Sequence, residues 1–118
     1  MRFLLLLAII ISSPLAVASM NVISANDLFD KNGITYNRKT NEPFSGRAVG
    51  KFYNGQPRSE AVYDNGIKDG EETIWYMNGK VRKKAAYKDG VRHGEWTTWD
   101  RDQRVLFHQN YQKGDRVY

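Results

Sequence analysis

Glycine recurs at a fixed spacing through most of this chain, and the residues between the glycines recur with it. Gly46, Gly70 and Gly94 are each separated by 24 residues. Seventeen residues after each of them stands a tyrosine, and twenty after each stands another glycine: Tyr63, Tyr87 and Tyr111, then Gly66, Gly90 and Gly114. A period of this length indicates an array of one small supersecondary unit. Since such a unit cannot bury its apolar face alone, neighbours must stack. The sequence predicts three repeats, residues 46–69, 70–93 and 94–118.

Each repeat contains two turn signals that separate runs typical of β-strands. The first signal is Asn54-Gly55, Asn78-Gly79 and Asp102-Gln103, and the second is Asn65-Gly66, Asp89-Gly90 and Lys113-Gly114. Asn-Gly and Asp-Gly favour the positive φ values of two-residue hairpin turns. The runs between them are rich in Val, Ile, Thr, Tyr and Trp, which suit strands. We expect strands at 47–53, 56–63, 71–77, 80–87, 95–101 and 104–111. The fold class is therefore all-β, an open antiparallel meander of tandem 24-residue β-hairpin repeats.

The third repeat lacks glycine in its first turn. Gln103 stands where the other repeats have Gly55 and Gly79. A non-glycine residue at positive φ costs about 1 kcal/mol, so this position predicts a different loop type.

A two-residue first loop determines which residues share a face of the sheet. In this register Trp75 lies across from Arg82, whose guanidinium can stack on the indole. The more apolar face is expected to pack, and contains Phe52, Ala61, Tyr63, Ile74, Tyr76, Val81, Ala85, Tyr87, Trp96, Val105, Phe107 and Tyr111. The other face is aromatic and basic, and its candidate partner-binding residues are Tyr53, Trp75, Met77, Arg82, Trp99, Arg101 and Arg104. The alternative is that long cationic side chains only cover an open sheet with their stems.

The first 18 residues are typical of a secretory signal peptide. Arg2 precedes an apolar run from Phe3 to Ile11, and Ala16-Val17-Ala18 forms an Ala-x-Ala cleavage pattern. An uncleaved membrane anchor is the alternative, but the run has about half of the ~20 apolar residues needed to cross a bilayer. We therefore expect export, with cleavage near Ala18 and a periplasmic or extracellular location. The chain has no cysteine, so stacking of the repeats must supply the stability that disulfides give other small exported proteins.

Residues 19–45 do not match the repeat and are expected to form an N-terminal cap with a degenerate first repeat. Asn32-Gly33 precedes a short predicted strand, Ile34 to Tyr36, and Ser24 can cap one helical turn before Leu28. At the other end of the chain the last strand is a free edge unless residues 115–118 fold back.

The residue types that carry catalysis or bind metals are few and scattered. His93 and His108 are the chain's two histidines, and neither has a second histidine or a cysteine at ligand spacing. A metal site needs three or four convergent ligands. Glu71 and Glu72 are adjacent, so on a strand they point to opposite faces and cannot act together. We interpret them, with Asp69, as charges at the rim of the sheet. The sequence predicts a non-enzyme without metal or cofactor.

Two stretches carry a resemblance to a known family. The stretches that begin at Gly70-Glu71-Glu72 and at Ala86-Tyr87-Lys88 resemble MORN repeats of the bacterial variant type. The lead-in, Asn32 to Tyr36 followed by Pro43 to Gly46, is similar to the start of YwqK-type antitoxin-like proteins. The resemblance covers residues 27–118. It implies a twisted open sheet of hairpins without catalysis, and roles in protein scaffolding, dimerisation or contact with anionic phospholipid.

Charge and export together limit the partner classes. The formal net charge is +5 and the isoelectric point is near 9.5, and export argues against nucleic acid as the partner. One hypothesis is a protein-interaction module of the antitoxin or immunity type. The other is a peripheral envelope protein that contacts anionic phospholipid or cell-wall polymer. A homodimer through the ends of the sheet stays open as well.

Overall fold

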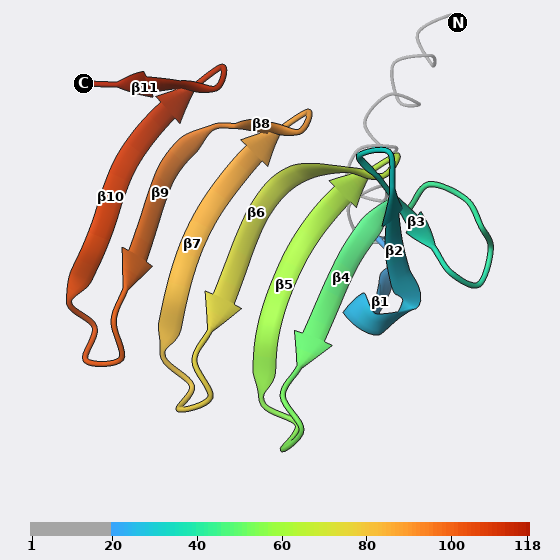
Figure 1. Cartoon of the computed structure of the whole chain (residues 1–118), viewed down its shortest axis with the longest axis horizontal. Helices are drawn as coiled ribbons and strands as arrows, with labels where there is room; N and C mark the ends of the chain where they lie inside the picture. The colour runs from blue at the N-terminus through green and yellow to red at the C-terminus, as the bar shows by residue number, and fades with distance from the viewer. Residues whose placement is uncertain (1–19) are drawn as a thin grey trace, which may run out of the picture.

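A computed structural model describes residues 20–118 of the chain. The predicted signal peptide, residues 1–18, lies outside the described residues. Within residues 20–118 there is no α-helix, and the dominant feature is one open β-sheet (Figure 1). A single 3₁₀ turn, η2, spans Ala25–Asp27, and the strands are β1 (Val22–Ser24), β2 (Leu28–Lys31), β3 (Ile34–Asn37), β4 (Gly46–Lys51), β5 (Pro57–Asp64), β6 (Ile67–Trp75), β7 (Val81–Lys88), β8 (Val91–Arg92), β9 (Gly94–Trp99), β10 (Val105–Gln112) and β11 (Asp115–Val117).

The long strands follow one another across the sheet in chain order. The order is β1-β4-β5-β6-β7-β9-β10-β11, and β8 extends the pairing of β7. All neighbours are antiparallel except β1, which runs parallel to β4. The six predicted strands and the antiparallel meander are confirmed, although β6 begins earlier than expected, at Ile67.

The second turn of each predicted repeat has the predicted geometry. Asn65 and Gly66 both have positive φ, 49° and 82°, and the turns at Asp89-Gly90 and Lys113-Gly114 match them. Such paired positive φ values are those of a two-residue type I′ turn, whose twist matches that of the strands.

The first turn of each predicted repeat differs from the prediction. Phe52 donates its N–H to the carbonyl of Gln56 at 2.8 Å, and Gly55 donates to Phe52 at 2.9 Å. Gly55 has positive φ, but Asn54 does not. The loop is therefore three residues long, a type I turn closed by one left-handed residue. The predicted two-residue loop is wrong.

The first turn of the third predicted repeat keeps this geometry without glycine. Gln103 has φ 67° and donates to the carbonyl of Asp100 at 3.0 Å, as Gly55 and Gly79 do in their own loops. The predicted change of loop type is therefore wrong. The side-chain amide of Gln103 donates to the carbonyl of Val81 at 3.1 Å, a contact with the neighbouring hairpin that glycine could not make and that offsets the backbone strain.

A β-bulge follows each three-residue loop and restores the predicted register. Trp75 pairs with Val81, whereas Ile74 pairs with Lys83, so Arg82 has no partner across the strand pair. The prediction that Trp75 lies across from Arg82 is wrong, because the extra loop residue shifts the pairing by one. Val81 and Val105 lie opposite tryptophans and not on the packing face as expected. The residues left unpaired by the three bulges are Arg58, Arg82 and Leu106.

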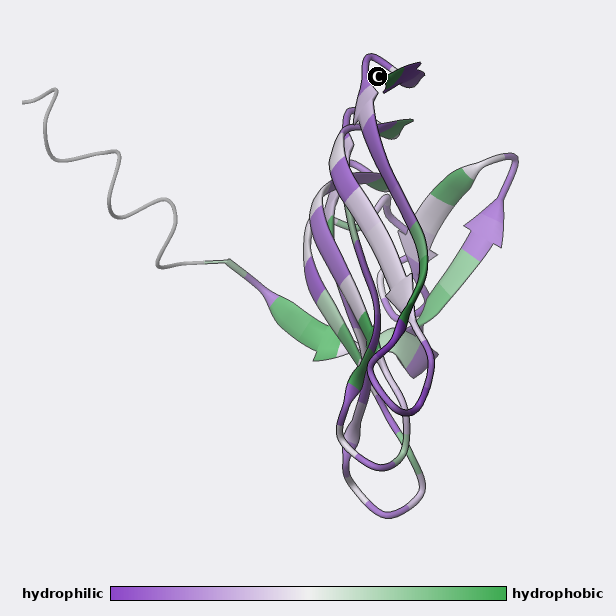
Figure 2. Cartoon of the chain, turned by 90° about the vertical axis from the view of Figure 1, so that its left-hand side faces the viewer, coloured by the Kyte–Doolittle hydropathy of each residue, from purple (hydrophilic) through white to green (hydrophobic). Residues whose placement is uncertain are grey.

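One face of the sheet, here called the tyrosine face, carries the small core. Tyr87 and Trp96 meet edge to face with centroids 5.1 Å apart, and Trp96 meets Tyr111 at 5.5 Å. Such aromatic pairs contribute about 0.5–1.5 kcal/mol beyond the area they bury. Ala85 is buried beside them, as predicted. Figure 2 shows the long strands mostly hydrophilic or neutral, with only short hydrophobic segments.

Cationic side chains cover the aromatic rings of this face. The Nζ atoms of Lys68 and Lys83 lie 5.2 and 4.9 Å from the ring centroids of Tyr87 and Trp96. The guanidinium of Arg92 lies over both Trp96 and Tyr111, at 5.0 and 5.2 Å. In a single-layer sheet, these cations take the place that a second layer of structure would otherwise occupy.

Both ends of the sheet are partly covered. At the N-terminal end β1 pairs with β4, an arrangement the sequence did not indicate. The β2–β3 hairpin projects from the sheet in Figure 2 and includes the predicted strand after Asn32-Gly33. The predicted turn at Ser24 is confirmed as η2, since the hydroxyl of Ser24 accepts from the N–H of Asn26. At the C-terminal end β11 folds back on residues 110–112 of β10.

The second-turn glycines connect each hairpin to the one before it. Gly66, Gly90 and Gly114 donate their N–H groups to the carbonyls of Phe44, Lys68 and Arg92 at 2.7, 2.8 and 3.1 Å. The space over these glycines is occupied, because a Cβ atom on Gly66 would lie 2.8 Å from the carbonyl oxygen of Thr35. Positive φ and the close approach of a neighbouring segment of the same chain both require glycine there.

We predict that Gly66→Ala destabilises the protein far more than Gly33→Ala. Both glycines follow asparagine in the same turn type, with φ 82° and 81°, but no atom lies within 4 Å of a Cβ built on Gly33. Gly33→Ala should lose about 1 kcal/mol from positive φ alone. Gly66→Ala should lose roughly 1–3 kcal/mol more because β3 must move. Urea unfolding followed by circular dichroism measures both, and equal losses would contradict the proposed contact between the turn and β3.

Candidate functional site

The three hairpin loops between the long strands lie at the lower edge of the sheet in Figure 1, and residues from all three line a hollow of about 460 Å³. It is lined by Phe52, Trp75, Tyr76, Met77, Arg82 and Arg101, and is called the loop-end hollow below. Phe52 comes from the β4–β5 loop, Arg101 comes from the β9–β10 loop, and the other four come from β6, β7 and their loop. Aromatic, thioether and guanidinium groups therefore meet at one place.

The local geometry of the second long hairpin places most of these side chains. Trp75 ends β6, and Tyr76 and Met77 follow it directly into the loop. Arg82 is the unpaired residue of the bulge in β7. A bulge turns its side chain away from the direction that regular alternation would give it. Because of this change Arg82 faces Tyr76 and not Trp75.

Tyr76 stands at the centre of the loop-end hollow. The guanidinium carbon of Arg101 is 4.9 Å from the centroid of its ring, and that of Arg82 is 5.9 Å away. The hydroxyl of Tyr76 donates to the carbonyl oxygen of Trp99 at 2.7 Å, so the ring is fixed against the next hairpin. Each cation–π contact contributes about 0.5–1 kcal/mol where exposed. The sequence analysis placed Tyr76 on the packing face. The run Trp75-Tyr76-Met77, directly before the turn, was the signal that could have assigned Tyr76 to the loop-end hollow.

The two arginines of the hollow have no acidic partner. Within residues 20–118 no carboxylate lies within 4 Å of Arg82 or Arg101. Arg104, which the sequence placed in the same set, is instead held by Asp100 and Asp102 at 3.0 Å each. The backbone N–H of Arg104 and then its side chain lower the pKa of Asp100 below its usual value. Arg104 is therefore neutralised inside its own loop.

The remaining predicted residues lie outside the hollow. Tyr53 is at the tip of the first loop and is 91% exposed. Trp99 is half-buried and lines a separate hollow with Glu71, Lys84 and Thr97 among others. The structure thus brings together four of the seven predicted residues, Trp75, Met77, Arg82 and Arg101, and adds Phe52 and Tyr76.

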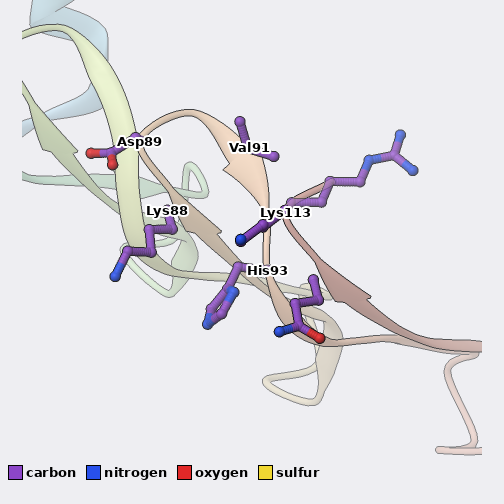
Figure 3. A pocket seen from close by; sticks show the side chains of 7 residues that line it. Lys88, Asp89, Val91, His93 and Lys113 are labelled. Carbon is purple, nitrogen blue, oxygen red and sulfur yellow. The ribbon is translucent and has the colours of Figure 1, made fainter. Parts of the chain in front are cut away.

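A second hollow lies at the opposite end of the strands, where the two-residue turns are. Figure 3 shows Lys88, Asp89, Val91, His93 and Lys113 around it, and Arg92 and Gln112 complete its lining. Within the described part of the chain no carboxylate lies within 4 Å of Lys88 or Lys113. His93 is exposed, as the sequence predicted. Three cations, Lys88, Arg92 and Lys113, and the carboxylate of Asp89 line this turn-end hollow, and its lining has no Phe, Tyr or Trp.

Glu72 has a different place from the one predicted. It is 8% exposed on the tyrosine face, so the interpretation as a rim charge is wrong for this residue. Nζ of Lys68 lies 2.6 Å from its Oε2, and Nζ of Lys83 lies 3.2 Å from its Oε1. Glu71 is exposed on the other face, as expected. Burial raises the pKa of Glu72, but the hydrogen bond and charge of Lys68, and then the charge of Lys83, outweigh it and leave this pKa below its usual value.

Two titratable side chains among the described residues, His108 and Glu72, are held by their neighbours. Within residues 20–118 no three His, Asp or Glu side chains come close enough to hold a metal ion. Nδ1 of His108 is 2.9 Å from the hydroxyl of Thr97, and its Nε2 is 3.7 Å from Glu95 on the exposed face. Glu72 is enclosed by two lysines that hold it ionised, which does not suit a general acid near neutral pH.

Comparison with known protein families, curated proteins and solved structures finds no match to this chain. Its function must therefore be argued from its own residues. Among the described residues, no helix has the length and apolar character needed to cross a bilayer.

We predict that Glu72→Gln weakens the dependence of stability on acid. Since the pKa of Glu72 is lowered by folding, its charge stabilises the native state above the unfolded pKa, about 4.3. That stabilisation is lost as the pH falls through the lower folded value. Urea unfolding at pH 7, 4 and 3 should show a smaller loss in the variant than in the wild type. Glu71→Gln, on the exposed face, is the control, and a loss in Glu72→Gln equal to that of wild type would refute the ion cluster.

We also predict that Tyr76→Phe reduces stability by about 1 kcal/mol, because the carbonyl of Trp99 loses its donor. Tyr53→Phe should be neutral, since Tyr53 is almost fully exposed. Thermal unfolding of the two variants decides this, and equal melting temperatures would show that the hydroxyl of Tyr76 does not join the loops.

Proposed function

We propose that this chain is an exported, non-catalytic array of three MORN-like repeats that serves as a protein-interaction module of the antitoxin or immunity type. The observation that carries the proposal is the convergence of Trp75, Tyr76, Arg82 and Arg101 in one open hollow. Trp, Tyr and Arg are the residue types enriched among the energetically dominant residues of protein interfaces. The proposal includes cleavage near Ala18 and a periplasmic or extracellular location.

Three features support the repeat assignment. The three-residue loops share one hydrogen-bond pattern, in which Phe52, Tyr76 and Asp100 take equivalent places. The bulges recur with the same spacing as the repeat. The second-turn glycines all donate to the hairpin before them. Units that make the same contacts with their neighbours are what a stacked array requires.

The loop residues vary where the framework does not. The two residues that open each loop are Phe52-Tyr53, Tyr76-Met77 and Asp100-Arg101. A constant scaffold with variable loop residues is the usual way in which binding surfaces are built. Variation at these positions therefore supports recognition by the loop end of the sheet.

We predict that Trp75→Ala reduces capture of the partner from envelope extract at least tenfold, because it removes half-buried aromatic surface from the hollow. Capture by the immobilised protein is quantified by mass spectrometry against a chain with Tyr53→Ala as control, whose side chain lies outside the hollow. Circular dichroism of both variants should match that of wild type. Partners captured equally by all three proteins would count against this function.

The second hypothesis, contact with anionic phospholipid or cell-wall polymer, is favoured by the turn-end hollow. Lys88 and Lys113 line it without an acidic partner within the described residues. Basic residues near an anionic membrane contribute about 1 kcal/mol each, and salt screens the attraction. Under this hypothesis, the protein should sediment with phosphatidylglycerol vesicles at low salt, and Lys88→Gln with Lys113→Gln should abolish it. No sedimentation at low salt eliminates the lipid form of this hypothesis.

A further inference from the structure

We propose that the loop-end hollow binds an extended acidic peptide segment, in which acidic residues at alternate positions contact Arg82 and Arg101 and an apolar neighbour packs against Trp75. This inference deepens the proposed function and rests on it, because it names the chemistry of the protein partner. It concerns the loop-end hollow alone, and does not involve the turn-end hollow.

The charges of the hollow are arranged for an anionic ligand. Arg82 and Arg101 both lie over the ring of Tyr76, at 5.9 and 4.9 Å from its centroid, so their guanidinium carbons are at most 10.8 Å apart. Both side chains are exposed, and within residues 20–118 neither has a carboxylate within 4 Å. Two cations near each other repel unless an anion lies with them. The ligand that completes this arrangement carries negative charge.

The separation of the two guanidinium groups, at most 10.8 Å, admits alternate residues of an extended chain. Residues i and i+2 of a strand are about 6.6 Å apart and point to the same side. Two carboxylates at this spacing can each contact one guanidinium within the limit set by Tyr76. Arginine binds a carboxylate with two parallel hydrogen bonds, which gives such a contact direction as well as charge.

The chain itself contains an example of this recognition. In the third loop, Asp100 and Asp102 are two residues apart, and both bind Arg104 at 3.0 Å. Nε of Arg104 faces Asp100, and its Nη2 faces Asp102. An Asp-x-Asp segment is therefore sterically able to enclose a guanidinium at the loop end of this sheet. In the proposed complex each of Arg82 and Arg101 would instead receive one carboxylate, from an extended segment and not from a turn.

The remaining lining favours a peptide over a membrane surface or free phosphate. Phe52, Trp75, Tyr76 and Met77 provide apolar surface around the two arginines. A peptide that covers these walls would exclude water from the arginines, which strengthens the hydrogen bonds between arginine and carboxylate. A phosphate ion has no group that would contact these walls. The lysines that suit a flat anionic surface, Lys88 and Lys113, lie at the opposite end of the strands.

A fluorescence polarisation titration of the full exported chain tests this inference. The probe is a labelled ten-residue peptide with Asp-x-Asp beside a leucine, and the matched peptide carries Asn-x-Asn. We expect the acidic peptide to bind at least tenfold more tightly than the amide peptide. Arg82→Gln and Arg101→Gln should each weaken it at least fivefold, and the attraction should fall as salt increases.

Control variants separate this site from general charge. Lys88→Gln and Lys113→Gln each remove a cation of the other hollow, and neither frees a carboxylate beside Arg101. Both should bind the acidic peptide within twofold of wild type. If either control loses as much binding as Arg82→Gln, the attraction is due to net charge and the inference is wrong. Equal affinity for the acidic and amide peptides is also a refutation.

Competition distinguishes the ligand classes. Displacement of the peptide by an unlabelled copy, but not by millimolar inorganic phosphate or phosphatidylglycerol vesicles, supports the peptide. Displacement by either of the latter at lower concentration assigns the hollow to that anion and overturns the inference. If Trp75→Ala abolishes partner capture but Arg82→Gln and Arg101→Gln do not, the proposed function stands and this inference fails. If Trp75→Ala has no effect on capture, the proposed function fails.

Discussion

The packing of aromatic rings from neighbouring strands, as of Trp96 between Tyr87 and Tyr111, is the interaction that holds this sheet together. A single-layer sheet has no second layer against which to bury its side chains, so cohesion must come from neighbours within the layer. The ring of Trp96 contacts the rings of Tyr87 and Tyr111 edge to face across successive strands, Lys83 lies over Trp96, and Arg92 lies over Trp96 and Tyr111. Within residues 20–118 no large side chain is completely buried. Stability is therefore distributed along the sheet, because each strand rests on its neighbours.

The same distribution explains where the chain places its charges. Glu72 lies on the buried side of the sheet, where a single unpaired charge would be costly, and two lysines neutralise it. Arg104 is neutralised by its own loop. Arg82 and Arg101 differ, since both are exposed and within the described residues neither has a carboxylate in reach. Exposed cations without a carboxylate partner in the described residues are available to an anionic ligand, and this contrast is the basis of the acidic-peptide proposal.

The bulges connect the framework to the candidate site. A three-residue loop displaces the pairing by one residue, and the bulge next to it restores the register on which the tyrosine face depends. The residue released by this correction in the second hairpin is Arg82. Its side chain then turns toward Tyr76, which the hydroxyl contact with Trp99 holds in place. The irregularity that protects the core thus also forms part of the hollow.

The sequence by itself determined the six long strands, their order and the core of the tyrosine face, Ala85, Tyr87, Trp96 and Tyr111, because turn residues and alternation of side chains are local properties of a chain. The two-residue turns at Asn65-Gly66 and its counterparts were predictable for the same reason. Only the tertiary structure decided the positions of Arg82, Tyr76 and Glu72, and the pairing of β1 with β4. The position of Arg82 depends on the extra loop residue, and that of Tyr76 depends on its hydroxyl, which reaches the next hairpin. The position of Glu72 depends on lysines from two strands. Such contacts join parts of the chain that no local pattern relates, so they form only when the hairpins stack.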